Sequence, residues 1–194
     1  SRGLGDVYKR QVYVFLAEGF EEIEALCPID IMRRAGIDVV TVSVPGGEYT
    51  TGSHNITIKT DLSFEQFKID EIPEMLVLPG GMPGAKNLSE DKRLASLLCQ
   101  TVASGGKVAA ICAAPFILGE LGILNGKHAT CYPGYESSLK GAIISAKNVV
   151  RDGNIITAIG MGASIEFGLA LVCALRGRDA SDKIAAAIHA RGDF

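Results

Sequence analysis

The sequence is poor in the features that mark metal centres, disulfide scaffolds, membrane spans and nucleic-acid binding. Only three histidines occur, and they stand at no metal-ligand spacing, so we expect no zinc site. The five cysteines are odd in number and include no C-x-x-C pair, which favours a reducing cytoplasm over a disulfide framework. No apolar run approaches the roughly 18 residues that a membrane span needs. The net charge of −3 indicates no basic face for nucleic acid.

The first eleven residues lack the marks of a natural start. They contain no initiator methionine, no apolar periodicity and no apolar core of a signal peptide. We therefore interpret residues 1–11 as a non-native N-terminal scar and exclude them from the fold. The chain as a whole is 47% apolar, which argues against disorder, and residues 12–194 are long enough for a single α/β domain.

Beyond the start, the chain alternates short apolar runs with segments of helical periodicity. The expected strands are 12–17, 37–44, 75–78 and 108–111, and the expected helices are 21–35, 91–104, 163–175 and 181–190. Unalternating apolar strands are typical of a parallel sheet covered on both faces. Pro28 falls inside the first helical pattern and predicts a kink or break there. The alternation indicates a doubly wound, mostly parallel sheet.

Four shorter elements are also expected. Residues 48–51 and 55–59 should pair as a small antiparallel excursion, and Asp152-Gly153 is a strong hairpin signal. Residues 62–67 are interpreted as a short helical turn, and 128–131 as a short strand. In doubly wound sheets, ligands bind beyond the carboxyl ends of the strands. The exits after residues 17, 78, 111 and 159 should therefore converge on one pocket.

Cys112 stands on one of these exits. Val108 to Ile111 predicts a buried strand, and Phe116 to Leu121 is compatible with a helix, with small residues and Pro115 between them. A strand that turns directly into a helix exposes one side chain and directs free N–H groups at it. We expect a thiol in this position to have a lowered pKa and to act as a nucleophile. The alternative is that Cys112 is a small buried hydrophobe, as most free cysteines are.

A nucleophilic thiol needs hydrogen-bond donors and an acid beside it. The backbone N–H groups of Ala113 and Gly81 could meet near Cys112 as oxyanion donors. The acid would come from Glu18, Glu21, Glu22 or Glu24 at the first strand exit, and spacing alone does not choose among them. A carboxyl group that donates to a thiolate must be protonated, which burial favours. For most of these acids, the alternative is a solvated helix N-terminus.

Five segments together resemble the ThiJ/PfpI superfamily, and within it the DJ-one branch associated with parkinsonism. They are residues 18–24 (EGFEEIE), 28–36 (PIDIMRRAG), 78–88 (LPGGMPGAKNL), 109–115 (AAICAAP) and 162–167 (GASIEF). The resemblance runs in order from Val12 to Arg178. It implies a flavodoxin-like α/β sandwich, like that of class I glutamine amidotransferases, usually assembled as a homodimer.

The resemblance also implies roles for particular residues. Cys112 matches the family's reactive cysteine, and Glu24 matches the protonated glutamate that hydrogen bonds to its sulfur. Gly81 and Ala113 match the backbone donors. Some members carry a histidine where this chain has Tyr132, so the proton carrier is open, and His128 is expected at the wrong end of its strand. Ala113 replaces the histidine that follows the cysteine in the protease branch, which disfavours a peptidase.

The other cysteines receive separate predictions. Cys27, Cys99 and Cys173 lie on apolar helix faces and are expected in the core. Cys131 and Tyr132 are expected near the pocket, Tyr132 either as a hydrogen-bond donor or as a pocket wall. Cys131 is a candidate for a second redox-active thiol.

Two functions compete at this point. The first is a glutathione-independent glyoxalase or protein deglycase, in which Cys112 attacks a dicarbonyl such as methylglyoxal, without metal or cofactor. The alternative is a redox sensor or oxidation-regulated chaperone in which peroxide oxidises the same cysteine. Thiamine biosynthesis ranks last, because no phosphate loop is present. We expect a cytoplasmic homodimer whose partners are a small dicarbonyl or a glycated protein, not nucleic acid or a membrane.

Overall fold

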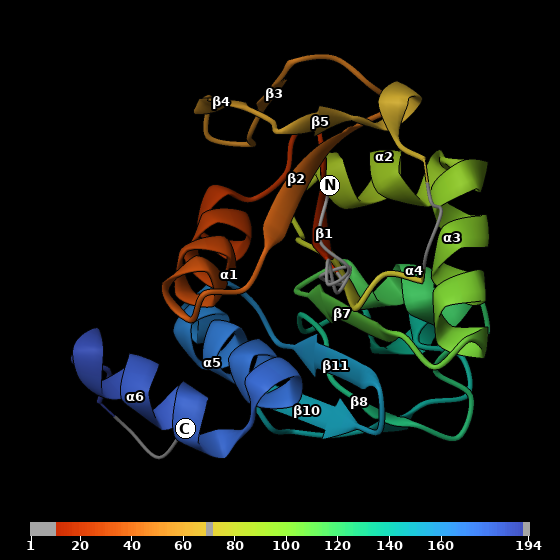
Figure 1. Ribbon diagram of the computed structural model, residues 1–194. Coiled ribbons are helices and arrows are strands. Elements are labelled where there is room, and N and C mark those ends of the chain that lie inside the picture. Colours follow the sequence, from red (N-terminus) through yellow and green to blue (C-terminus); the bar gives the residue numbers. More distant parts are fainter. Residues whose placement is uncertain (1–10, 69–71, 192–194) are drawn as a thin grey trace, which may run out of the picture.

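The computed structural model describes residues 11–68 and 72–191. The expected N-terminal scar lies outside the described residues, except for Gln11. A seven-stranded sheet forms the centre of the molecule, in the order β10-β11-β7-β6-β1-β2-β5 (Figure 1). Its strands are β1 (Val12–Ala17), β2 (Val39–Val44), β5 (Leu62–Ser63), β6 (Met75–Leu78), β7 (Lys107–Ile111), β10 (Val149–Asp152) and β11 (Ile155–Ala158). All neighbouring pairs are parallel except β10 with β11.

Helices cover both faces of this sheet (Figure 1). One face is covered by α1 (Glu22–Arg34) and α5 (Ser164–Arg176), with α6 (Arg178–Ala187) against α5, and the other by α2 (Gly84–Glu90), α3 (Lys92–Ala103) and α4 (Pro115–Glu120). Successive side chains of a strand point to opposite faces. Phe15 of β1 therefore enters the core on the α2–α4 side, and Leu16 enters the core on the α1–α5 side. The predicted doubly wound, flavodoxin-like fold is confirmed.

The remaining elements are short. Strands β3 (Tyr49–Thr51) and β4 (Thr57–Lys59) form the expected antiparallel hairpin, and β10 turns into β11 at the expected hairpin position. Strands β8 (His128–Ala129) and β9 (Ile143–Ile144) pair in parallel. The 3₁₀ turns are η1 (Phe64–Gln66), η2 (Glu136–Ser138) and η3 (Met161–Ala163). The helical turn expected over 62–67 is thus a two-residue strand followed by η1.

The helix around Pro28 is not broken. α1 runs through this proline from Glu22 to Arg34, although proline removes one N–H from the helix ladder. Packing against α5 holds the helix at this point, where Gly168 allows a close approach. A Cβ atom at Gly168 would lie 2.8 Å from Cδ1 of Ile31 and 3.2 Å from Cα of Pro28. The predicted break is therefore wrong, because tertiary packing outweighs the lost bond, and the kink expected as its alternative stays a prediction.

Two helices, α2 and the last helix, differ from the prediction by more than one residue. α2 was not expected, since its seven residues offer only Ala85 and Leu88 as an apolar pattern, and both are buried. α3 follows with Asp91 as its N-cap, whose side chain accepts hydrogen bonds from the N–H groups of Arg93 and Leu94. The last helix begins at Arg178 instead of 181. Within the described part of the chain, no helix is both long and apolar enough to cross a bilayer.

Candidate active site

Cys112 occupies the predicted turn between a strand and a helix. Its N–H donates to the Ala158 carbonyl at 2.9 Å, which ties the residue to the end of β11. Its φ of 65° lies in the left-handed region, which costs roughly 1 kcal/mol or more for a residue other than glycine. Pro115 then starts α4. The side chain is partly exposed, so the bend presents the thiol at the carboxyl end of the sheet.

Two backbone amides hydrogen bond to the Cys112 sulfur. They are the N–H groups of Ala113 and Gly81, the two donors expected from the sequence. Gly81 has a φ of 87°, and a Cβ atom there would overlap the backbone N of Glu21. Glycine is therefore required for this amide to reach the sulfur. In this structure both amides bind the sulfur itself, so any role toward an oxyanion depends on a bound substrate.

Glu24 is the acid that lies at the thiol. Its carboxyl group is hydrogen bonded to Cys112 and accepts from the Gly80 N–H at 3.0 Å and from the Met161 N–H. The residue is 1% exposed. Burial raises the pKa of this carboxyl group to about 7, and the negative charge of Glu21 adds to the rise. Glu24 is therefore partly protonated near neutral pH.

The predicted low pKa of the Cys112 thiol is wrong when Glu24 is ionised. Burial, followed by the Glu24 carboxylate, raises the pKa of this thiol to about 12, and the amides of Ala113 and Gly81 only partly oppose the rise. Because the two groups are hydrogen bonded, they titrate as a pair. Loss of one proton from the pair hinders loss of the second, because the charge left behind opposes another negative charge beside it. Between the two losses, Cys112 and Glu24 share a single proton.

Tyr132 contacts the same bend from the other side. Its N–H donates to the Cys112 carbonyl at 2.8 Å, and its side chain is half-exposed. The ring lies against Gly160, where a Cβ atom would be 3.4 Å from the tyrosine Cδ2. Cys131, in contrast, is buried in the core, and burial followed by the charge of Glu136 raises its thiol pKa to about 11. This burial gives no support to Cys131 as a second redox thiol.

The predictions for the three helical cysteines have different outcomes, and His128 is placed beside an aspartate. Cys99 is exposed, so its assignment to the core is wrong: the inward face of α3 is formed by Leu94, Leu97 and Leu98, and the next residue turns toward solvent. Cys27 and Cys173 are half-buried on α1 and α5. His128 donates its backbone N–H to Asp152 at 2.9 Å, and its ring lies 3.1 Å from the same carboxylate.

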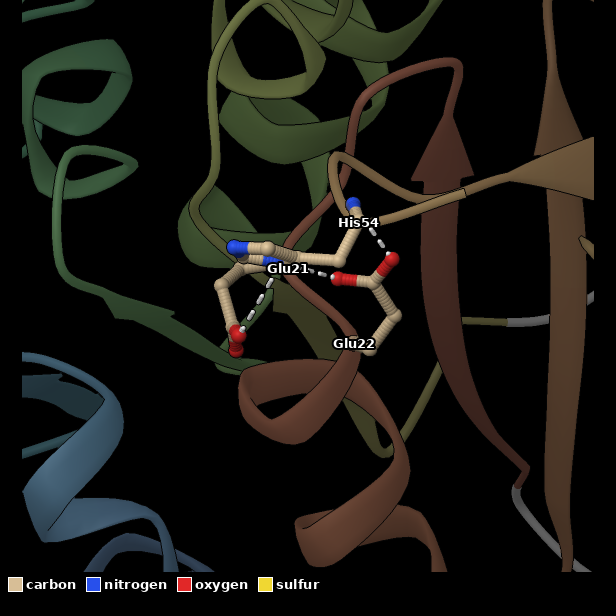
Figure 2. Close-up of side chains that lie close together, drawn as sticks. All are labelled: Glu21, Glu22 and His54. Atoms are coloured by element: carbon tan, nitrogen blue, oxygen red, sulfur yellow. Dashed lines mark hydrogen bonds and ion pairs between the residues drawn. The ribbon is translucent and has the colours of Figure 1, made fainter. Parts of the chain in front are cut away.

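Sequence reasoning missed a cluster of Glu21, Glu22 and His54 beside this site (Figure 2). His54 lies in the β3–β4 hairpin, and its backbone N–H and ring Nδ1 meet the Glu22 carboxylate at 2.7 and 2.8 Å. Ligand atoms of the three residues lie within 4.8 Å of one another, close enough to hold a metal ion. Since Glu22 is already bonded to His54, we interpret the cluster as a hydrogen-bonded ion pair. No local pattern links His54 to residues so distant in sequence.

The protonation of this pair follows from its contacts. Burial would raise the pKa of the Glu22 carboxyl group, but the hydrogen bonds from His54 outweigh it and lower the pKa. The hydrogen bond to Glu22, and then the charges of Glu22 and Glu21, raise the pKa of the exposed His54 ring. Glu22 thus carries negative charge at neutral pH, with a titratable imidazole against it.

Comparisons with known proteins identify the family of this chain. Residues 10–174 match the DJ-1/PfpI family, to which the chain therefore belongs. The chain is 36% identical over 178 residues to protein dj-1beta of Drosophila melanogaster, which covers 91% of this chain and 95% of that protein. The crystal structure of that DJ-1beta has a TM-score of 0.88 to this structure, covering 95% of this chain and all of the other.

Two further relatives bear on function. A deglycase of Pyrococcus abyssi is 33% identical over 151 residues, or 76% of this chain and 89% of that protein. The structure of an oxidized DJ-1 from Toxoplasma gondii is 34% identical, covers 93% of this chain and 98% of the other, and has a TM-score of 0.88. The membership in the DJ-1/PfpI family that the sequence motifs predicted is confirmed.

Proposed function

We propose that this protein is a glutathione-independent enzyme that acts on small dicarbonyls such as methylglyoxal, with Cys112 as nucleophile and Glu24 as proton carrier. The observation that carries the proposal is the contact of the buried Glu24 carboxyl group with a sulfur that also receives the amides of Gly81 and Ala113. The similarity to a protein named as a deglycase supports the same class of substrate.

In the first step, the thiolate of Cys112 attacks the aldehyde carbon of methylglyoxal. A carbon–sulfur bond forms, and the electron pair of the carbonyl π bond moves to oxygen. Glu24 gives its proton to this oxygen, which produces a hemithioacetal and a carboxylate. The amides of Gly81 and Ala113, freed from the sulfur as its charge is lost, can hydrogen bond to the developing oxyanion.

In the second step, the Glu24 carboxylate removes the proton from the former aldehyde carbon and returns it to the neighbouring carbon, while the hemithioacetal hydroxyl gives its proton to the oxygen of the neighbouring carbonyl group. The first carbon is oxidised and the second is reduced, so no external electron acceptor is needed, and the product is a thioester of lactate. Water then releases lactate and the Cys112 thiol. A carboxyl group whose pKa is about 7 is suited to both donation and acceptance of a proton near neutral pH.

Deglycation would be the same reaction, with the methylglyoxal supplied by a glycated side chain. A glycated side chain in equilibrium with free methylglyoxal would be repaired as the enzyme consumes the free aldehyde. A direct deglycase would instead release lactate faster than the adduct dissociates. Comparing lactate formation with the rate at which a chemical trap captures free methylglyoxal from the same adduct separates these two routes.

The test of the proposal uses reduced protein and methylglyoxal, without glutathione. We expect lactate formation by the wild type, no lactate above background with Cys112→Ala, and a loss of about 100-fold or more with Glu24→Gln. Equal lactate from the wild type and from Cys112→Ala would refute the proposal. Cys99→Ala is the matched control, because Cys99 is exposed on α3 and should not affect the rate.

Oxidation sensing is a second candidate, which the partly exposed sulfur beside a protonatable acid favours. Peroxide would oxidise the thiolate to sulfenate, with water as the other product, and a second peroxide would give the sulfinate. The similarity to a DJ-1 from Toxoplasma gondii whose structure is named as oxidized supports this candidate. Peptide mass spectrometry after mild peroxide should show two added oxygens on Cys112. Equal oxidation of Cys112 and Cys99 would count against a sensor or a regulated chaperone.

We further propose that residues 12–194 form one domain that works as a homodimer in the cytoplasm. The five free cysteines suit a reducing compartment. Ile23 on α1 and Ile165 on α5 are large apolar side chains, 48% and 45% exposed, which a second copy could cover. Light scattering after gel filtration should give twice the chain mass, and Ile23→Glu should shift it toward the monomer.

A further inference from the structure

Glu21 lies in the cluster with His54 (Figure 2) and is also hydrogen bonded to Glu24 of the thiol pair. Its Oε2 accepts a hydrogen bond from the Glu24 N–H at 2.7 Å, and its own N–H donates to the Gly80 carbonyl at 2.9 Å. These bonds fix the start of α1 against the exit of β6. The Glu21 side chain is only 14% exposed, so its carboxylate is held close to Glu24 in a poorly solvated place.

The charge of Glu21 acts unequally on the two members of the pair. After burial, the Glu21 carboxylate is the charge that raises the pKa of Glu24, whereas after burial the charge that raises the pKa of Cys112 is that of Glu24. A negative charge disfavours a second one more strongly the nearer it lies. When the pair holds one proton, Glu21 therefore disfavours the form with a carboxylate and a neutral thiol.

We infer that Glu21 is a positioning residue for the proposed reaction: it keeps the shared proton on Glu24 and leaves the negative charge on the Cys112 sulfur. The inference deepens the proposed function and rests on it, because thiolate attack on an aldehyde needs this form of the pair. Glu21 does not touch the sulfur and acts through Glu24.

His54 sets how strongly Glu21 acts. Its Nδ1 lies 3.9 Å from Oε1 of Glu21, so a protonated ring offsets part of the Glu21 charge. The charged groups that act on His54 are Glu22 and Glu21, and those that act on Glu24 are Glu21 and Cys112. As pH rises and His54 loses its proton, the ring no longer offsets the charge of Glu21. The pair of Cys112 and Glu24 then favours the form with a thiolate more strongly.

The experiment measures the rate at which iodoacetamide alkylates Cys112 from about pH 5 to 9, followed on the Cys112 peptide by mass spectrometry. Glu21→Gln keeps an oxygen to accept the Glu24 N–H but removes the charge. Two changes are expected. The pH at which the alkylation rate reaches half of its plateau, the midpoint, should fall by roughly 0.5 pH unit or more. The reason is that the Glu21 charge opposes loss of the first proton from the pair. The plateau rate should fall about threefold or more, because the shared proton moves toward sulfur.

Glu18→Gln is the matched control. Glu18 is an exposed acid next to the same loop whose carboxylate accepts from the Thr51 N–H, and its loss should move neither midpoint nor plateau. His54→Asn should move the midpoint upward, opposite to Glu21→Gln, because a positive charge is lost. An unmoved midpoint in Glu21→Gln overturns the inference, and so does a shift of equal size in Glu18→Gln.

The same measurement separates this inference from the proposed function, since alkylation needs no dicarbonyl. A wild type that makes no lactate, with the midpoint shifted by Glu21→Gln, refutes the function and leaves the effect of Glu21 on the pair standing. A wild type that makes lactate, with an unmoved midpoint in Glu21→Gln, keeps the function and removes Glu21 from it.

Discussion

The carboxyl group of Glu24, on the first turn of α1, is hydrogen bonded to the thiol of Cys112, at the bend between β7 and α4. The contact passes beside Gly80, where a Cβ atom would lie 2.5 Å from Oε2 of Glu24 and 2.7 Å from Cβ of Cys112. Because Gly80, at the exit of β6, has no side chain, the Glu24 carboxyl group and the Cys112 thiol can come into contact. Several expected outcomes depend on this contact.

Substitution of Glu24 by glutamine should change how stability depends on pH. The folded-state pKa of Glu24 is raised to about 7 from 4.5, so its contribution to stability is complete below about pH 4.5 and is lost as pH rises through about 7. Glutamine keeps the shape and has no charge to bury. We expect Glu24→Gln to exceed the wild type in stability at about pH 8 by roughly 1–3 kcal/mol, and to match it near pH 4.5.

Urea unfolding at both pH values measures this difference. The control is Glu166→Gln, which removes an acid from the first turn of α5. A Glu24→Gln variant that is less stable than the wild type at both pH values would contradict the assignment of a costly buried charge.

Gly81→Ala should damage both stability and thiol chemistry. The new Cβ would overlap the Glu21 backbone N and lie 2.7 Å from the Gly19 carbonyl, in addition to the strain of a positive φ. Gly105 has a similar φ of 82° but open space around it, so Gly105→Ala isolates the strain alone. We expect about 1 kcal/mol of destabilisation for Gly105→Ala and about 3 kcal/mol or more for Gly81→Ala.

Denaturant midpoints give the comparison, and the alkylation rate of Cys112 shows whether the Gly81 amide has moved. If the two alanine variants unfold at the same denaturant midpoint, the close approach of the exit of β6 to the start of α1 adds nothing to the cost of the Gly81 substitution.

Cys112 should tolerate glycine better than alanine. Its φ of 65° strains every residue with a Cβ, whereas glycine adopts this conformation freely. Cys112→Gly should therefore be more stable than Cys112→Ala by about 1 kcal/mol, with both inactive. Calorimetric melting of the two variants tests this order. The reverse order would mean that packing of the Cβ group at the bend outweighs backbone strain.

Tyr132→Phe should leave the proposed activity within about threefold of the wild type, because the contact of this residue with the bend is made by its backbone N–H. Tyr132→His should instead add a titrating base near the thiol and alter the pH profile of turnover. Steady-state lactate formation across pH distinguishes the two. A loss of 100-fold or more in Tyr132→Phe would assign a chemical role to the phenol hydroxyl.

The strands, and the bend that carries Cys112, could be predicted from sequence because buried parallel strands leave unbroken apolar runs. The choice of Glu24 could not be made from spacing, since four acids stand close together at one strand exit. Their environments decide among them: Glu18 is exposed, Glu21 caps the helix, Glu22 bonds to His54, and Glu24 is buried at the sulfur. Only the family resemblance made that choice in advance.

Other features depend on contacts between distant segments, which no local pattern contains. The unbroken α1 at Pro28 follows from packing against α5, and the cluster at His54 follows from the docking of a hairpin. The thiol pKa was predicted with the wrong sign because the helix amides were weighed, whereas burial and then the Glu24 charge outweigh them. Cys99 was misplaced because the apolar face of α3 is narrower than its sequence pattern indicates.

The two groups that hold the Cys112 sulfur besides Glu24 are main-chain amides, and main-chain amides are present whatever side chain a position carries. Point substitutions can therefore reach the sulfur's immediate surroundings at few places, chiefly Glu24 and Gly81. Tyr132, Met82 and Met161 have half-exposed side chains, and each either belongs to this site or lies next to one of its residues in sequence. These side chains can change without removing the amides that hold the sulfur. Substrate preference could thus drift through these side chains over generations while the reactive centre stays intact.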